Sequence, residues 1–130
     1  MQKKAKNKTD FANYKLRPVF RDNRGDIFDI VEDNVGHVGM VTFNEGVTRG
    51  QHWHKHSTQY SYVLDGKIKL IVSDLQKRWK KVLMLGPGSL TCIPPKTIHT
   101  YSAITPAKML DITTVSRSKN GYEKDTYRVY

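Results

Sequence analysis

Three of the chain's five histidines fall within the stretch "RGQHWHKH" of residues 49–56. His52, His54 and His56 occupy alternate positions, and alternate residues of a β-strand point to the same face of a sheet. A strand here would therefore gather imidazole rings on one side. Neutral imidazole nitrogens bind divalent metals, and imidazole also titrates near neutral pH, which suits a general base. The spacing predicts a metal site or a site for proton abstraction, with His56 interpreted as a structural residue.

Gln59 and His99 extend this candidate site. Gln59 follows His52 by seven residues, and His99 comes much later, after "IPPKTI". In a β-barrel the two hairpins can face each other across the interior, which brings His99 toward His52, His54 and Gln59. Three histidine nitrogens and one amide oxygen suit a single divalent ion, Zn²⁺, Fe²⁺, Ni²⁺ or Mn²⁺. The metal ligands predicted by this pattern are His52, His54, Gln59 and His99.

The same histidines also suit a metal-free proton transfer. His52 or His54 can remove a proton from a carbon next to a carbonyl group, because the carbonyl acidifies that carbon. The enolate that develops needs a positive or hydrogen-bonding partner, for which Arg49, Lys55 or a bound metal are candidates. Tyr101 shares the face of the last histidine and can donate a proton. The candidate catalytic residues are therefore His52, His54 and Tyr101.

The rest of the sequence consists of short apolar or alternating runs separated by turns. The runs that we expect to form strands are residues 26–33, 37–43, 61–64, 67–72, 80–86, 89–93 and 108–115. Asp65-Gly66 is the strongest hairpin signal, since both residues tolerate positive φ. No stretch sustains a helical period, so the fold class is all-β, a sandwich or barrel. We expect residues 1–12 to form a basic flexible tail and residues 13–130 a single domain.

Composition limits the environment and the partners. The single cysteine, Cys92, excludes an internal disulfide and fits a reducing cytoplasm. There is no apolar run long enough for a secretory signal or a membrane span, so we expect a cytoplasmic protein without a membrane partner. The net charge of +10 attracts polyanions, anionic membranes or phosphorylated small molecules, and charge alone does not decide among them. The basic runs carry no nucleic-acid motif, so we expect no nucleic-acid partner.

Several of these residues together resemble the two motifs of the cupin superfamily. The residues that carry the resemblance are Gly50-Gln51-His52-Trp53-His54, Gln59, Gly66, Gly88, Pro94 and His99. Gln59 stands where these motifs usually have glutamate, and Lys96 where the second motif often has glycine. The resemblance covers residues 46–103 and implies a small jelly-roll barrel, also called a double-stranded β-helix.

Two stretches resemble more closely the cupins that act on nucleotide-linked sugars. "DNRGDIFDI" at 22–30 and "GVTRGQHWHKHSTQ" at 46–59 are similar to dTDP-4-keto-6-deoxyhexose 3,4-ketoisomerases, deoxysugar 3,5-epimerases and the C-terminal cupin of capsule-type bifunctional reductase/epimerases. The tail "YEKDTYRVY" at 122–130 is similar to ketoisomerase tails. The tyrosine that ketoisomerases carry in the strand before the histidines is absent from "HVGMVTF".

This resemblance implies an isomerase or epimerase of a nucleotide-linked keto-deoxysugar, in surface polysaccharide or deoxysugar biosynthesis. Its substrate-binding candidates are Arg24 and Arg49, as phosphate ligands, and Lys55. Two alternatives stay open: a metal-dependent cupin of another activity, an oxygenase or decarboxylase, and a non-catalytic small-ligand-binding cupin. The histidines can hold one divalent metal or act without metal.

The segment "FANYKLRPVF" at 11–20 alternates apolar and polar residues, as an added strand would. In the cupins that this chain resembles, N-terminal strands commonly pair across a dimer, and a two-fold homodimer is the commonest closed oligomer. We therefore predict a homodimer. The residues expected at its contact are Phe11, Tyr14, Leu16, Val19 and Phe20.

Overall fold

The computed structural model of the chain describes residues 10–129, so most of the predicted tail lies outside the described residues. The described elements are β1 (Ala12–Lys15), β2 (Phe20–Asp22), β3 (Gly25–Ile27), β4 (His37–Phe43), β5 (Thr48–His54), β6 (Gln59–Asp65), β7 (Ile68–Asp74), β8 (Lys80–Leu85), β9 (Ser89–Ile93), β10 (Thr97–Ala103), β11 (Ala107–Thr113), the 3₁₀ helix η1 (Ser118–Asn120), α1 (Gly121–Asp125) and β12 (Thr126–Arg128). No helix among residues 10–129 is both long and apolar enough to cross a bilayer.

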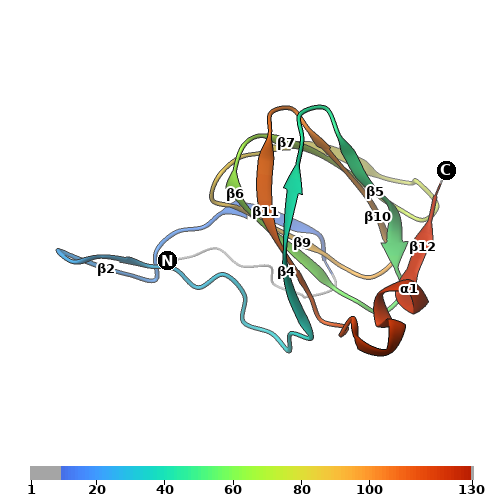
Figure 1. Ribbon diagram of the computed structural model, residues 1–130, viewed down its shortest axis with the longest axis horizontal. Helices are drawn as coiled ribbons and strands as arrows, with labels where there is room; N and C mark the ends of the chain where they lie inside the picture. The colour runs from blue at the N-terminus through green and yellow to red at the C-terminus, as the bar shows by residue number, and fades with distance from the viewer. Residues whose placement is uncertain (1–9, 130) are drawn as a thin grey trace.

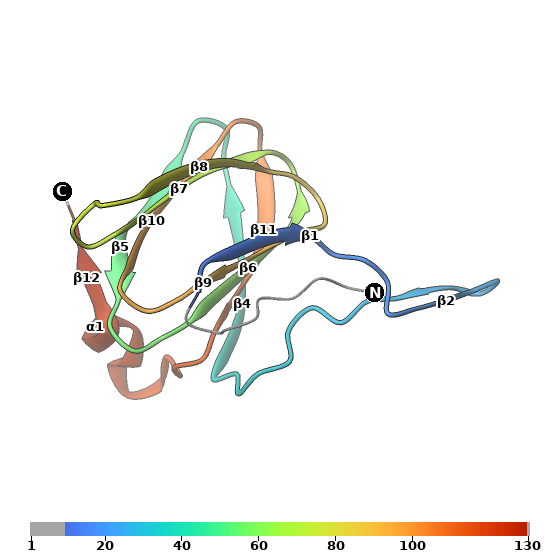
Figure 2. The ribbon, with the colours of Figure 1, turned by 180° about the vertical axis from the view of Figure 1, so that it is seen from behind.

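Two antiparallel five-stranded sheets face each other and form the barrel (Figures 1 and 2). One sheet has the strand order β1-β9-β6-β11-β4, and the other has the order β12-β5-β10-β7-β8. A separate two-stranded hairpin, β2-β3, extends from the barrel as an arm (Figure 1). The all-β jelly-roll prediction is confirmed, with the predicted turn at Asp65-Gly66 joining β6 to β7.

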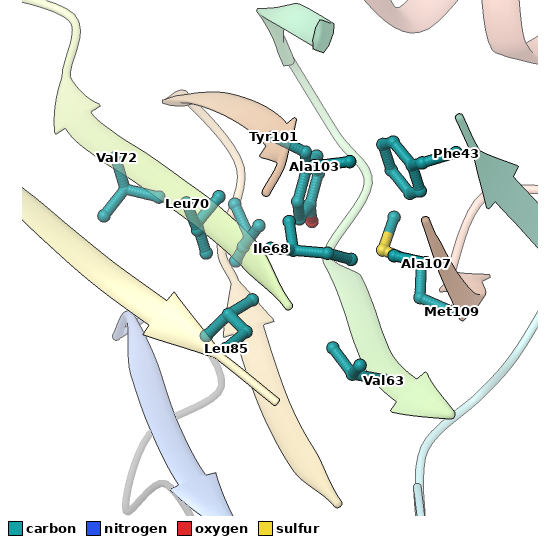
Figure 3. Close-up of a cluster of buried hydrophobic side chains, with 11 residues drawn as sticks. Phe43, Val63, Ile68, Leu70, Val72, Leu85, Tyr101, Ala103, Ala107 and Met109 are labelled. Carbon is teal, nitrogen blue, oxygen red and sulfur yellow. The ribbon is translucent and has the colours of Figure 1, made fainter. Parts of the chain in front are cut away.

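The apolar core fills the barrel interior and borders the histidines, since Phe43, Tyr101 and Met109 line the same cavity as His52. Its buried side chains are Phe43, Val63, Ile68, Leu70, Val72, Leu85, Ile93, Tyr101, Ala103, Ala107 and Met109, most of which are labelled in Figure 3. Full burial of one large aliphatic side chain contributes about 1.5–3 kcal/mol to stability. Along β10 the inward side chains change from Ala103 and Tyr101 in the core to His99. The strands that build the core thus also carry the polar site.

Most of the segment 11–20, which we predicted to form a dimer contact, packs against its own chain. β1 pairs with β9 of the same chain, as Figure 2 shows. Phe11 packs against the main core, whereas Tyr14 and Leu16 belong to a second apolar cluster on the outer side of that sheet. Only Val19 and Phe20 of the predicted set are exposed, at 47% and 50%.

The predicted strand at residues 26–33 is wrong beyond Ile27. The strand β3 ends there, and the following residues form no ladder. Ile30 and Val31 instead pack against the second apolar cluster. Their apolar side chains produced the strand-like pattern, but they cover the sheet rather than extend it.

Candidate functional site

The two histidines of β5 face the interior because a bulge precedes them. Gly50 and Gln51 both have positive φ, 98° and 58°. The pairing of β5 with β10 shifts there, so that His52 lies opposite His99 and Gly50 opposite Thr100. A Cβ on Gly50 would lie 2.7 Å from the His99 carbonyl oxygen, so only glycine allows this close approach.

His52, His54 and His99 form one cluster. Their ring centroids are 4.7–5.3 Å apart, and one nitrogen of each ring lies within 4.8 Å of the others. His99 is a neighbour of His52 in the same sheet, which corrects the predicted arrangement across the interior. Gln59 alone comes from the facing sheet, on β6. Its side-chain oxygen lies 3.0 Å from His54 Nε2.

The proton position on His99 follows from its backbone contact. His99 Nδ1 lies 3.0 Å from the Thr97 carbonyl oxygen, which can only accept, so Nδ1 carries the proton. Nε2 then presents a lone pair, and it is buried without a hydrogen-bond partner among residues 10–129. Complete burial holds the His99 pKa well below its ordinary value, so the ring is neutral at pH 7. A neutral, orphaned imidazole nitrogen beside two others fits a divalent metal.

His54 lies between two partners. Its Nε2 is 3.0 Å from Gln59 Oε1, and its Nδ1 is 3.3 Å from Thr126 Oγ1. Burial lowers the His54 pKa and keeps the ring neutral, so it carries one proton. Because Gln59 Oε1 can only accept, that proton is on Nε2, which donates to Gln59. His54 is thus fixed on both sides by the protein.

His52 is the histidine that a ligand meets. It is half-buried and lines a cavity of about 410 Å³, which lies within the usual size range of ligand pockets. Burial, followed by the neighbouring His54 and nearby arginines, lowers the His52 pKa to about 4. At pH 7 the ring is neutral and can accept a proton.

Three arginines surround the same cavity: Arg49, Arg117 and Arg128. The side chain of Arg49 donates to the Thr42 carbonyl oxygen at 3.2 Å and lies over the Phe43 ring. Guanidinium groups pair with phosphate in a two-pronged geometry, so this wall favours a phosphorylated ligand.

The C-terminal segment covers the histidines. The Tyr122 ring lies 6.1 Å from His52 and 5.8 Å from His54, centroid to centroid, and the Arg117 guanidinium lies 4.5 Å from the Tyr122 ring. The Asp125 carboxylate accepts from the backbone N–H groups of His56 and Ser57 at 2.8 and 3.0 Å. β12 completes the contact by pairing with β5.

Comparison with known proteins gives the family. The model of a cupin domain matches residues 39–113, more than half of the chain. The chain belongs to the cupin domain family. No curated protein sequence matches it.

Solved structures similar to this cupin include enzymes of nucleotide-linked sugars. The sugar 3,4-ketoisomerase QdtA from Thermoanaerobacterium thermosaccharolyticum, solved with TDP, is 22% identical, with a TM-score of 0.74 over 92% of this chain and 88% of that one. A 3,4-ketoisomerase from Helicobacter canadensis is 20% identical, with a TM-score of 0.74 over 94% and 92%. The dTDP-4-dehydrorhamnose 3,5-epimerase from Sulfolobus tokodaii is 18% identical, with a TM-score of 0.69 over 92% and 76%. At this identity the likeness establishes a shared fold.

The remaining predicted site residues of the cupin lie at different distances from the cavity. Tyr101 lines it, and its hydroxyl contacts the Ser61 hydroxyl and the Gln59 amide nitrogen. Lys55 is exposed beyond the end of β5 and is not a lining residue. Arg24 lies on the arm, where its guanidinium pairs with Asp22 at 2.7 Å, and it does not line the cavity.

Sequence reasoning missed Asp111, Arg117, Tyr122 and Arg128, all of which line the cavity. The only signal for three of them was the tail "YEKDTYRVY" and the residues just before it, which follow the last barrel strand. Asp111 gave no signal, because a single aspartate in a strand-like run has many structural explanations.

The buried histidines predict a loss of stability in weak acid. Their pKa values are lowered in the folded cupin, so between pH 6.5 and about 4 the unfolded chain binds more protons. The contribution of these histidines to the free energy of unfolding is therefore complete above pH 6.5 and is lost as the pH falls. For His52 the loss between pH 7 and pH 5 is on the order of 1–2 kcal/mol.

Urea unfolding at pH 7 and pH 5 measures this loss. A His52→Gln variant removes one titrating group, so its free energy of unfolding should change less between the two pH values. The exposed His56→Gln variant serves as the matched control and should behave as the wild type. An equal pH dependence in the wild type and in His52→Gln would contradict the prediction.

Proposed function

We propose that this cupin is an isomerase or epimerase of a nucleotide-linked keto-deoxysugar, which moves a proton next to the sugar ketone. The observation that carries the proposal is His52, a neutral imidazole that lines a cavity together with three arginines. Two similar folds support the substrate class: QdtA was solved with TDP, and a mutant of QdtA in which asparagine replaces a histidine was solved with TDP-4-keto-6-deoxyglucose.

In the proposed reaction His52 takes the proton from the carbon next to the ketone. The electron pair left behind forms an enolate, and a guanidinium beside its oxygen stabilises the negative charge. Arg49 and Arg128, which line the cavity, would hold the diphosphate, and Arg128 would have to leave its ion pair with Glu123 to do so.

For an epimer, Tyr101 gives a proton to the opposite face of the same carbon, and His52 and Tyr101 then recover their starting states by proton exchange with solvent. For an isomer, the adjacent hydroxyl passes its proton to the old ketone oxygen and becomes the new ketone, while His52 returns its proton to the old ketone carbon. His54 stays in contact with Gln59 and supports the ring of His52.

A bound metal competes with this use of His52. His52, His54 and His99 fit a divalent ion with Gln59 as the oxygen donor, and the orphaned Nε2 of His99 favours such a site. When bound, the ion supplies Lewis-acid polarisation of a carbonyl oxygen. A nitrogen that binds metal cannot also take a proton, so a metal-bound cupin would favour an oxygenase or a decarboxylase.

Incubation with dTDP-4-keto-6-deoxyglucose in D₂O, with and without a chelator, tests the proposal. We expect deuterium to enter the sugar at C3 or C5 in both samples, as read by mass spectrometry and NMR. Absence of exchange with this and related keto-sugar nucleotides would refute the proposed function. A redox-active iron or copper at about one per chain in elemental analysis, together with no exchange, would favour the metal-dependent alternative.

We further propose that the cupin forms a homodimer, through the arm rather than through β1. Val19, Phe20, Ile27 and Phe28 on and next to the arm are 44–55% exposed. A two-stranded hairpin with exposed apolar side chains is only marginally stable by itself, and a second copy of the chain would cover it. We also propose a location in the reducing cytoplasm, which the free, buried thiol of Cys92 suits.

Charged substitutions on the arm test the dimer. Deletion of residues 1–20 would also remove β1 from its own sheet, so point variants separate assembly from folding. We expect the wild type to have the mass of a dimer in light scattering, and Phe20→Asp to have that of a monomer with an unchanged circular dichroism spectrum. Val82→Asp, at a position of β8 that is 60% exposed against 50% for Phe20, should remain dimeric. A monomeric wild type or a dimeric Phe20→Asp would exclude the arm as the interface.

A further inference from the structure

Asp111 is a buried carboxylate in the cavity wall that the proposed proton transfer does not use. It lies on β11, is only 5% exposed and lines the same cavity as His52. In register it lies between Ser61 on β6 and Gly39 on β4. The carboxylate therefore belongs to the sheet opposite the histidines.

One oxygen of Asp111 is held and the other is not. Oδ2 accepts a hydrogen bond from Arg117 Nη2 at 2.6 Å. Oδ1 is buried and has no hydrogen-bond partner within the described part of the chain. Of the neighbours in register, the Ser61 hydroxyl contacts Tyr101 and Gly39 has no side chain. The His37 ring lies over Gly39 and interacts electrostatically with Asp111, but it makes no hydrogen bond to Oδ1, and its own Nε2 is also buried without a partner in the described part of the chain. A buried carboxylate oxygen needs a donor, and in a cavity wall a ligand can supply it.

Arg117 fixes the direction of this carboxylate. Its guanidinium is held on one side by Asp111 and lies 4.5 Å from the centre of the Tyr122 ring. An acceptor held in this way is prepared for a donor before the ligand arrives, so little ordering is needed when it binds.

We propose that Asp111 is a specificity-determining residue that accepts a hydrogen bond from a hydroxyl group of the glycosyl ring. The inference rests on the proposed function and adds the part of the substrate that is recognised. A carboxylate oxygen attracts a hydroxyl and repels a ketone oxygen, because it can only accept. Asp111 therefore orients the sugar with a hydroxyl toward β11 and leaves the ketone to the opposite wall, where His52 and Arg49 lie.

The test compares two ligands by isothermal titration calorimetry: dTDP, which lacks a glycosyl ring, and dTDP-glucose, which has one with free hydroxyls. The variants are Asp111→Asn, which keeps the size of the side chain, and Asp111→Ala. The matched control is Asp74→Asn, since Asp74 also pairs with an arginine, Arg78, but lies outside this cavity.

We expect the wild type and Asp74→Asn to bind dTDP-glucose more tightly than dTDP. Asp111→Ala should bind dTDP-glucose at least about tenfold more weakly, with dTDP affinity changed less than about twofold, because a hydrogen bond to a charged group is lost. Asp111→Asn should show the same selective loss to a smaller extent. A merely structural role would weaken both ligands together.

Three outcomes would overturn the inference. The first is unchanged binding of dTDP-glucose by both Asp111 variants, and the second is a parallel loss of both ligands. The third is a wild type that binds dTDP but shows no preference for dTDP-glucose. A wild type that binds neither ligand would instead contradict the proposed function itself, and the inference with it.

Discussion

Replacement of His52 by asparagine should lower the rate of deuterium exchange into dTDP-4-keto-6-deoxyglucose by about 10²–10⁴-fold, the usual contribution of a positioned general base. Asparagine is close to histidine in size but cannot take a proton in this pH range. His52 is half-buried, so the fold should tolerate the change. The measurement is the rate of mass gain in D₂O at saturating substrate, with the circular dichroism spectrum as evidence of folding.

Two further variants separate the base from a metal ligand. His56→Asn, on the exposed residue just beyond β5, should exchange at the wild-type rate. His99→Asn removes a residue that is fully buried and does not line the cavity. If His52 acts as a base without metal, His99→Asn should retain much more activity than His52→Asn. Equal losses in both variants would indicate a shared metal, and full activity of His52→Asn would refute its role as the base.

Local sequence signals were sufficient for an all-β sandwich or barrel and for the shared face of His52 and His54, whereas the jelly-roll barrel was predicted from the resemblance to cupin motifs. Positive-φ residues at tight turns and alternating runs determine where strands end, and these features are visible in the chain itself. Asp65-Gly66 and the pair His52 and His54 were predicted for these reasons. Which strands become neighbours depends on contacts between distant segments, so the placement of His99 beside His52 was not predicted correctly.

The site residues that the sequence did not predict depend almost entirely on contacts between distant segments. Arg117 and Tyr122 reach the histidines only because the C-terminal segment turns back and adds β12 to the edge of β5. No spacing in the sequence marks that return. Asp111 looks like any polar residue in a strand until its two neighbours in register are known. The residue that we propose for substrate specificity is therefore one that a motif does not identify.

The second large effect concerns Gly66, the glycine of the turn between β6 and β7. We expect Gly66→Ala to destabilise the cupin by roughly 2–5 kcal/mol, since two costs combine. Gly66 has φ +85°, a left-handed conformation that costs about 1–2 kcal/mol for other residues. An added Cβ would also collide with the Pro106 carbonyl oxygen and lie 2.7 Å from Ala107 Cα, and overpacking typically costs about 1–3 kcal/mol more.

Gly46→Ala is the matched control, because it carries the first cost without the second. Gly46 has φ +80° in a turn, but an added Cβ there would have no atom within 4 Å. Urea unfolding should therefore show a loss of about 1–2 kcal/mol for Gly46→Ala. The difference between the free energies of unfolding lost in Gly66→Ala and in Gly46→Ala measures how closely residues 105–107 pack on the β6-β7 turn. If the two variants lose equal stability, the turn relaxes away from Pro106, and the motif glycine is required for its backbone conformation alone.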